Sequence, residues 1–264
     1  MFKLKNSIEP RTKIHYFELI YNLAKKDLKV RYKSATLGFL WTILNPLLMM
    51  VALTVVFSMF LRIKTEFPYS IFVLTGLIPW TFFNLSLSSC TNSITDNCNQ
   101  IKKVYFPREI IPLSIVLANL VNYLLSLLIL LFLLLFFRIK LTYLVLLVPI
   151  IIGVQLLFTI GISLITSSLN VYYRDIRYIV EATLLIWFYA TPVFYPISMV
   201  PERFRPYYFF NPMAGIIYSY REALLKGVFP DVYLFLEAFL ASLIFFFLGY
   251  MIFKRIEPVF ADFI

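Results

Sequence analysis

Long apolar runs alternate with short polar segments along the chain, and six of the runs are long enough to cross a bilayer. About 20 helical residues span a hydrocarbon core of roughly 30 Å, because each residue adds about 1.5 Å to a helix. The first run follows the basic segment DLKVRYKS, and no charged side chain occurs from Leu37 to Leu61. The pattern therefore predicts an all-α integral membrane protein with six transmembrane helices. The predicted spans cover residues 38–61, 70–90, 112–137, 143–168, 178–195 and 232–253.

The polar segment before the first run predicts an N-terminal amphipathic helix at the membrane surface. Its apolar residues recur at steps of three and four, while lysines occupy another face. Aromatic side chains opposite basic ones suit an interfacial helix in the plane of the lipid headgroups, and a solvated helix packed on a partner subunit is the alternative. The apolar positions are Ile14, Phe17, Tyr21, Ala24 and Leu28, and the lysines are Lys26, Lys29 and Lys33.

Composition predicts one membrane domain rather than two soluble ones. Apolar residues make up 61% of the 264 residues and charged residues 14%, whereas soluble domains have about 45–50% and about 25%. We therefore expect residues 1–264 to form a single transmembrane domain. Within it, residues 1–37 form the interfacial helix, residues 38–253 the six-span bundle and residues 254–264 a short tail.

The distribution of basic residues predicts the orientation of this domain. Sixteen of the 24 Lys and Arg residues fall before residue 38, in the loops 91–111 and 169–177, or after residue 253. Loops rich in Lys and Arg stay in the cytoplasm, so both termini are expected there. Because these residues adjoin apolar runs, topology accounts for the net charge of +10, and nucleic acid is not an expected partner.

The external loop between the fifth and sixth spans is not a plain connection. Residues 192–231 contain six prolines that separate apolar pieces too short to span the membrane. Non-helical backbone at membrane depth is tolerated only where protein or a water-filled cavity satisfies its polar groups. We therefore predict a re-entrant periplasmic segment that forms an external gate, and a simple interfacial cap is the alternative. The candidate gate residues are Pro192, Tyr195, Pro196, Asn211 and Pro212.

The loop after the second span, TDNCNQIKKVYFPREIIPLS, combines basic and aromatic residues. Pro107 disfavours helix at Phe106, which predicts a break between a short loop helix and the third span. Aromatic side chains beside charges favour a docking surface, whereas a loop that only obeys the charge rule would need no aromatic cluster. The candidate docking residues are Lys102, Lys103, Tyr105, Phe106 and Arg108.

No arrangement of residues predicts a catalytic or metal site. His15 is the one histidine, and the sequence has neither a Gly-rich phosphate loop nor suitably spaced paired carboxylates. We therefore expect a protein that is not an enzyme and that draws on an outside energy source. The alternative is a secondary transporter or lipid-linked sugar flippase driven by an ion gradient. It would need more intramembrane charge than Glu181 and Glu237 provide.

Aromatic residues are unusually frequent, with 28 Phe, 18 Tyr and 3 Trp. Aromatic faces stack on the apolar faces of sugar rings without fixed hydrogen-bond geometry, which would suit a polysaccharide conduit. Lipid-facing positions and interfacial belts are the alternative for any single aromatic residue.

Several motifs, in this order along nearly the whole chain, resemble the permease subunit of ABC polysaccharide exporters. That family moves O-antigen, capsule or teichoic-acid chains. The motifs are DLKVRYKSATLGFLWTILNP (27–46), GLIPWTFF (76–83), KKVYFPREIIPLS (102–114), NVYYRDIRYI (170–179), ATPVFYP (190–196) and FNPMAGIIYSYREALL (210–225).

The resemblance implies a homodimeric permease domain bound to two copies of a cytoplasmic ABC ATPase subunit, in the bacterial inner membrane. ATP and Mg would be held by that partner, and no cofactor by this chain. The implied substrate is a polysaccharide linked to an undecaprenyl pyrophosphate lipid, with O-antigen favoured over capsule or teichoic acid. Cations at headgroup level would meet the pyrophosphate, although they also anchor the helix among membrane lipids. The candidate headgroup residues are Lys29, Arg31 and Lys33.

Overall fold

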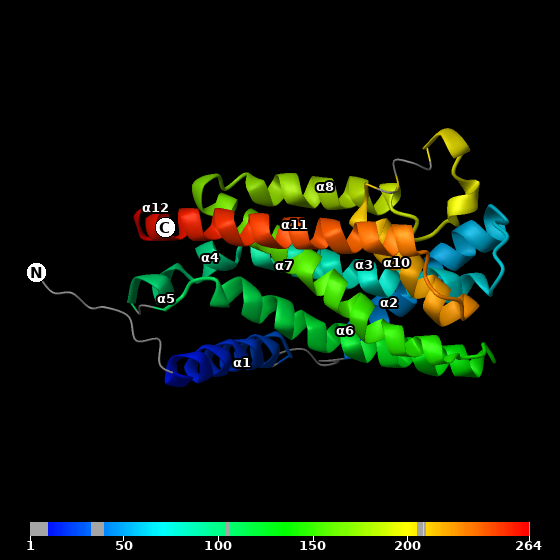
Figure 1. Cartoon of the computed structure of the whole chain (residues 1–264), viewed down its shortest axis with the longest axis horizontal. Helices are drawn as coiled ribbons and strands as arrows, with labels where there is room; N and C mark the ends of the chain where they lie inside the picture. The colour runs from blue at the N-terminus through cyan, green and yellow to red at the C-terminus, as the bar shows by residue number, and fades with distance from the viewer. Residues whose placement is uncertain (1–9, 33–39, 104–105, 205–207, 209, 264) are drawn as a thin grey trace, which may run out of the picture.

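The computed structural model describes residues 10–32, 40–103, 106–204, 208 and 210–263, and within these ranges it contains helices and connecting segments but no strand. Figure 1 shows the helices gathered into one elongated bundle. The α-helices are α1 (Pro10–Tyr32), α2 (Leu40–Leu53), α3 (Tyr69–Thr91), α4 (Ser93–Asp96), α5 (Cys98–Lys103), α6 (Ile110–Phe136), α7 (Val148–Tyr172), α8 (Ile176–Ala190), α10 (Pro212–Arg221), α11 (Val232–Ile256) and α12 (Phe260–Phe263). Short 3₁₀ and π segments are η1 (Thr54–Phe60), η2 (Tyr143–Leu147), η3 (Ile197–Met199), η4 (Glu202–Phe204), η5 (Glu222–Lys226) and η6 (Glu257–Val259).

Four helical segments in the described part of the chain are long and apolar enough to cross a membrane. They match the predicted second, third, fourth and sixth spans, because each long apolar run becomes one uninterrupted helical segment. These segments are Tyr69–Thr91, Ile110–Phe136, Tyr143–Tyr172 and Val232–Val259.

The other two predicted spans correspond to shorter helices. The first run forms α2, which contains Pro46, and continues as the π-helical segment η1. The fifth run forms α8, whose 15 residues end at Ala190 rather than at residue 195. The predicted end was therefore wrong, because Pro192 disfavours helix at the preceding residue and the apolar residues after it form a turn.

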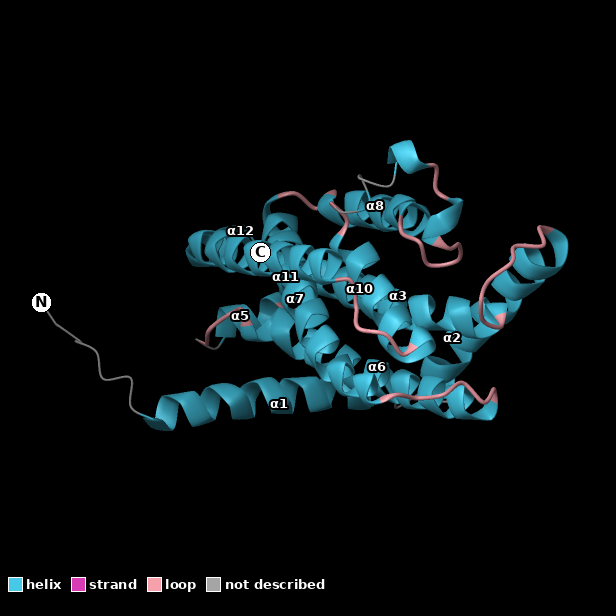
Figure 2. Ribbon diagram, turned by 45° about the vertical axis from the view of Figure 1, so that its right-hand side comes forward, coloured by secondary structure: helices cyan, strands magenta, loops and turns pink. Residues whose placement is uncertain are grey.

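Helix α3 occupies the centre of the bundle. It contacts α6 and α7, and also α2, α8 and α10. In Figures 1 and 2, α8 lies along one side of the bundle, α6 and α1 lie along the other, and α11 and α7 pass between them. The large apolar core includes Leu74, Phe83 and Phe158, which are almost completely buried. Such an arrangement buries apolar stripes of helices against one another.

Helices α7 and α11 make the most extensive contact of any helix pair in the described chain. A Cβ atom at Gly249 would lie 2.2 Å from the carbonyl oxygen of Gly161, and one at Gly161 would lie 2.5 Å from the carbonyl carbon of Phe245. The two backbones approach this closely because neither glycine has a side chain, as in small-residue crossings of membrane helices.

Helix α1 is confirmed as a helix and lies beside α6 (Figures 1 and 2). Ile20 and Ala24 are buried in the described structure, whereas Phe17 and Tyr21 are 70% and 65% exposed. The predicted apolar face is therefore divided. One stripe packs on the bundle, and the exposed aromatics remain available for another apolar surface.

The two ends of the bundle hold different segments. At the end that we call the C-terminal end, α5, the start of α6 and α12 lie together (Figure 1). At the opposite end lie the loop 61–68, the loop 137–142 and the described residues of the segment 191–231. The predicted break at Pro107 is confirmed, because α5 ends before it and α6 begins at Ile110.

Candidate functional site

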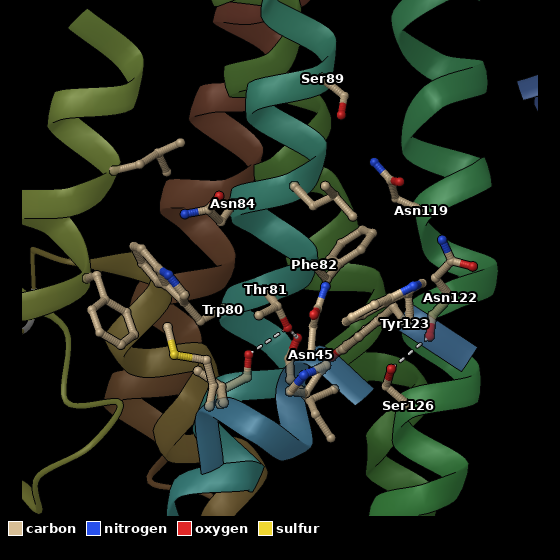
Figure 3. A pocket seen from close by; sticks show the side chains of 18 of the residues that line it. Asn45, Trp80, Thr81, Phe82, Asn84, Ser89, Asn119, Asn122, Tyr123 and Ser126 are labelled. Atoms are coloured by element: carbon tan, nitrogen blue, oxygen red, sulfur yellow. Dashed lines mark hydrogen bonds between the residues drawn. The ribbon is translucent and has the colours of Figure 1, made fainter. Parts of the chain in front are cut away.

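A cavity of about 710 Å³ lies between α2, α3, α6 and α8. Its volume is within the usual range of small-molecule sites, roughly 300–1,000 Å³. Figure 3 shows polar side chains from α3 and α6 around this space, with Asn45 of α2 at its front. The polar lining consists of Asn45, Thr81, Asn84, Ser89, Asn119, Asn122 and Ser126, and the indoles of Trp41 and Trp80 line it as well.

The sequence of α6 places its polar residues on one face. Asn119, Asn122, Tyr123 and Ser126 follow one another at steps of three, one and three, so all four side chains point toward α3 and the cavity (Figure 3). Asn119 donates to the hydroxyl of Ser86 on α3 at 3.3 Å. Polar side chains are costly in the middle of an apolar helix unless they face a partner or a water-filled space.

Two hydroxyl groups in the lining, those of Thr81 and Ser126, are bonded to carbonyls of their own helices. Ser126 donates to the carbonyl of Asn122 at 3.0 Å, and Thr81 donates to the carbonyl of Leu77 at 2.8 Å. Asn84 is half-buried and makes no side-chain hydrogen bond within the described structure. Its amide is therefore free to bond to an occupant of the cavity.

Aromatic rings form the back of the cavity. Phe82 and Tyr123 stack with their centroids 4.7 Å apart and their planes 19° apart. The Tyr123 hydroxyl hydrogen bonds to the Tyr220 hydroxyl at 2.6 Å and to Oε1 of Gln155 at 2.8 Å. Gln155 in turn donates to the carbonyl of Pro79 at 2.8 Å. This network fixes α3, α6, α7 and α10 to one another behind the cavity.

At the end of the bundle opposite the C-terminal end, Arg221 binds the turn that follows α8. Its guanidinium donates to the carbonyls of Pro192 and Val193, each at 2.6 Å, and lies 3.7 Å above the ring centroid of Phe72. Tyr69 donates its hydroxyl to the next carbonyl, that of Phe194, at 2.6 Å. The candidate gate residue Pro192 therefore lies in a turn fixed by two side chains.

Asn211 connects the end of α8 to the start of α10. Its Oδ1 accepts from the backbone N–H of Met213 at 3.1 Å and from the indole N–H of Trp187 at 2.9 Å. Its Nδ2 donates to the Thr191 hydroxyl at 2.9 Å. The sequence specifies this geometry, because Asn is a preferred N-cap and Pro212 a preferred first helical residue.

The remaining candidate gate residues, Tyr195 and Pro196, lie beyond this connection. The Tyr195 hydroxyl is 3.0 Å from the carbonyl of Tyr189 and 2.7 Å from the Tyr208 hydroxyl. Pro196 is half-buried and precedes η3. The structure thus brings Pro192, Asn211 and Pro212 together at the junction of α8 and α10, with Tyr195 and Pro196 farther along the chain.

The candidate docking residues have different surroundings. Lys102 and Lys103 are exposed at the end of α5. Phe106 is half-buried and packs on a small apolar cluster at the C-terminal end of the bundle. Arg108 is bonded through its backbone N–H to the carboxylate of Glu257, while Tyr105 lies outside the described residues.

The candidate headgroup residues are less completely described. Lys29 is exposed on α1. Arg31 belongs to the last turn of α1, but its side chain is not described, and Lys33 lies outside the described residues. The proximity of these three side chains therefore stays a prediction.

Sequence reasoning missed the cavity and the Arg221 interactions. The signal for the cavity was present in α6, where amides and hydroxyls recur at helical spacing inside an apolar run. Arg221 gave a weaker signal, as a cation in a segment of otherwise short apolar pieces. In the described residues no group of three or more His, Cys, Asp or Glu side chains is placed to hold a metal ion.

Comparison with known proteins identifies the family of the chain. Residues 18–225 match the family described as ABC-2 type transporter. The "O-antigen export system permease protein RfbA" of Klebsiella pneumoniae is 36% identical over 253 residues, which cover 94% of this chain and 95% of that protein. The protein of the same name from Myxococcus xanthus is 36% identical over 219 residues, covering 82% and 84%. The "Polysialic acid transport protein KpsM" of Escherichia coli is 21% identical over 221 residues, covering 78% and 81%.

The family match extends over most of the chain, from α1 to η5. Both O-antigen export permeases named above exceed 30% identity over more than two thirds of their own lengths. These matches confirm the resemblance to ABC exporter permeases that the sequence motifs carry. The chain belongs to the ABC-2 type transporter family.

Proposed function

We propose that this chain is the membrane permease of an ATP-driven exporter that moves a lipid-linked polysaccharide, O-antigen on undecaprenyl pyrophosphate, across the bacterial inner membrane. The observation that carries the proposal is the alignment with the K. pneumoniae permease, which includes nearly all of both proteins. The polysialic acid transport relative is more distant, at 21% identity, and this difference favours O-antigen over polysialic acid.

In this proposal the permease does not hydrolyse ATP. Two copies of the chain form a homodimer with the conduit between them, and two cytoplasmic ABC ATPase subunits hold ATP and Mg. The exposed α2 supports a second copy, because Leu48, Met49 and Val51 are each about half exposed on a helix that borders the cavity. Large exposed apolar side chains of this kind suit a protein or lipid contact.

The proposed topology has six spans and cytoplasmic termini. Helix α2 with η1 serves as the first span and α8 as the fifth, and α10 serves as a re-entrant helix at the periplasmic side. The basic residues support this orientation, because most of them belong to segments at the C-terminal end of the bundle or to α1. The burial of α10 against α3 and α11 supports a re-entrant helix, since it leaves little of this short helix exposed.

The cavity beside α3 supplies the proposed contact with sugars. Its indoles offer flat faces for sugar rings, and its amides and hydroxyls offer hydrogen bonds to sugar hydroxyl groups. Side chains of both kinds occur together in one cavity, whereas a lipid-facing surface would need only apolar ones. We assign this cavity to the wall of the conduit.

Two surfaces complete the proposal at the cytoplasmic side. Lys29, Arg31 and Lys33 would meet the pyrophosphate headgroup, because clustered cations attract phosphates at a membrane surface. The loop with Lys102, Lys103, Tyr105, Phe106 and Arg108 would dock the ATPase. The two exposed lysines of α5 support docking, since a partner subunit can reach them.

The test is export in cells that lack the gene for this chain. Restoring the chain together with its ATPase should return the polymer to the cell surface, and an ATPase variant unable to hydrolyse ATP should not. The two proteins should also purify together. Export that continues after ATP depletion but stops when the ion gradient is collapsed would instead support a secondary transporter. Analysis of the retained polymer would distinguish O-antigen from capsule or teichoic acid.

A further inference from the structure

Charged side chains from two distant parts of the chain meet at the C-terminal end of the bundle. Nζ of Lys254 lies 2.7 Å from Oε1 of Glu109 and 2.9 Å from Oε2 of Glu257. The other oxygen of the Glu257 carboxylate accepts the backbone N–H of Arg108 at 2.9 Å. The Arg108 guanidinium also donates to the Glu257 carbonyl. Two cations and two carboxylates therefore join the loop before α6 to the residues that end α11.

Burial makes this arrangement more costly to break than an ordinary surface ion pair. The side chain of Glu109 is 8% exposed and that of Glu257 is 19% exposed. A carboxylate that loses its cation in such surroundings keeps its desolvation cost without the compensating attraction. Lys254, which bonds both carboxylates at once, is thus the central member of the cluster.

Apolar contacts hold the same two segments together. Phe253 of α11 and Phe260 of α12 are fully buried with Ile101 of α5 in the small apolar cluster. Phe106 packs against this cluster, and the Arg108 guanidinium lies 5.8 Å from the ring centroid of Phe260. The loop therefore contacts the end of the chain through both its charged and its apolar side chains.

Helix α1 reaches the same place. Burial raises the pKa of the Tyr16 hydroxyl to about 12, and the neighbouring Glu109 carboxylate contributes to the rise. The influence of this carboxylate indicates that Tyr16 lies near the charged cluster, in agreement with the packing of α1 on α6. The docking loop, α11 and α1 all converge there.

We infer that residues 254–263, which we call the C-terminal strut, position the docking loop and connect it mechanically to α11. Lys254 and Glu257 are positioning residues, because they hold Arg108 and Glu109 without belonging to the docking surface. When the ATPase moves the loop, the strut moves α11 with it. The close crossing of α11 with α7 passes this displacement into the bundle. The inference rests on the proposed docking of an ATPase at this loop.

The experiment measures polymer exported per ATP hydrolysed by the complete complex of permease and ATPase. Lys254→Ala should lower this ratio about fivefold, an effect within the range observed for residues that couple distant sites. Lys254→Arg should keep most of the ratio, because arginine can bond both carboxylates. The matched control is Arg255→Ala, which removes the same charge from the exposed neighbouring residue and should leave the ratio unchanged.

A second variant separates positioning from folding. Lys254→Ala leaves Glu109 buried without its cation, so it can reduce folding. Combining Glu109→Gln with Lys254→Met removes the more deeply buried ion pair, and the less buried Glu257 keeps its hydrogen bond from the Arg108 backbone, so this variant should cost less stability than Lys254→Ala. This double variant should still assemble with the ATPase, but it should show the same fall in export per ATP. Trypsin should cleave faster after Lys102 and Lys103, because the loop is released.

The outcomes are distinct. Wild-type export per ATP and wild-type cleavage in the double variant would overturn the strut, as would an equal loss in Arg255→Ala. Failure of the wild-type chain to assemble with any ATPase would instead remove the proposed function on which the strut rests.

Discussion

Arg221 is buried near the end of the bundle opposite the C-terminal end, and no carboxylate of the described chain forms an ion pair with it. Its charge is compensated by backbone carbonyls of the turn after α8 and by the face of Phe72. A planar guanidinium reaches two carbonyls at once and stacks on a ring, whereas an ammonium is a point charge on a flexible stem. The residue therefore acts as a structural clamp of the candidate gate.

The first prediction concerns this clamp. Arg221→Lys should lower the free energy of unfolding by about 2 kcal/mol, because a carbonyl that the guanidinium bonded is left buried without a partner. The thermal midpoint of the purified permease in detergent measures the change. Arg203→Lys, made at an exposed position of η4, is the control and should leave the midpoint within error. Equal midpoints for Arg221→Lys and the wild type would mean that the turn does not depend on the clamp.

At the scale of helices, the α7–α11 crossing depends on two backbones in direct contact. Because the atoms that a new side chain would meet are backbone atoms, no rotamer change relieves the clash. Another glycine of α7, Gly153, has open space around it instead, with nothing within 4 Å of an added Cβ. Replacing glycine by alanine is therefore expected to destabilise the crossing at Gly249 and to be tolerated at Gly153.

The second prediction compares these positions. Gly249→Ala should destabilise the permease by about 2 kcal/mol, because an overpacked crossing forces the two helices apart. Gly153→Ala should be neutral or should stabilise by up to about 1 kcal/mol, because alanine favours helix over glycine. Thermal unfolding of both variants under the same conditions provides the comparison. A Gly249→Ala variant as stable as Gly153→Ala would show that the crossing tolerates separation.

The long helices were the part of the fold that the sequence predicted best. The four long spans follow from apolar runs, because hydropathy is a local property and a bilayer requires about 20 such residues. The end of α8 was misplaced because the apolar residues after Pro192 extend the run without extending the helix. Arg221, by contrast, bonds to carbonyls 28 and 29 residues earlier, and no local pattern indicates such a pairing.

The candidate sites also differ in whether they depend on neighbouring residues or on residues far apart in the sequence. The Asn211–Pro212 cap depends only on adjacent residues, although the sequence analysis named these two residues as part of a gate and not as a cap. Arg108 was predicted as a docking residue from its charge, but its guanidinium is directed to Glu257, 149 residues away. The cavity needed several helices to be assembled first, because its asparagines come from α2, α3 and α6.

At the scale of the whole molecule, the cavity, the clamp and the charged cluster are connected through the same helices. Helix α3 lines the cavity with Asn84 and, near its start, contributes Tyr69 to the turn that Arg221 holds. Helix α11 carries Lys254 at one end and crosses α7 along its length. A displacement that starts at the proposed docking loop therefore has a packed route to the cavity and to the turn after α8.

The third prediction tests whether the cavity contacts the polymer. Asn84→Leu should lower the export rate about fivefold, because a sugar hydroxyl loses its amide partner and one such hydrogen bond contributes about 1 kcal/mol. Folding should be unchanged, since Asn84 makes no side-chain hydrogen bond within the described structure. Val121→Leu on the exposed face of α6 adds apolar surface outside the cavity and is the control. Both variants are compared by export of the polymer at equal permease level and equal ATPase association. If Asn84→Leu exported as fast as Val121→Leu, the polymer would have to pass by another surface, and the exposed face of α2 would become the next candidate for the conduit wall.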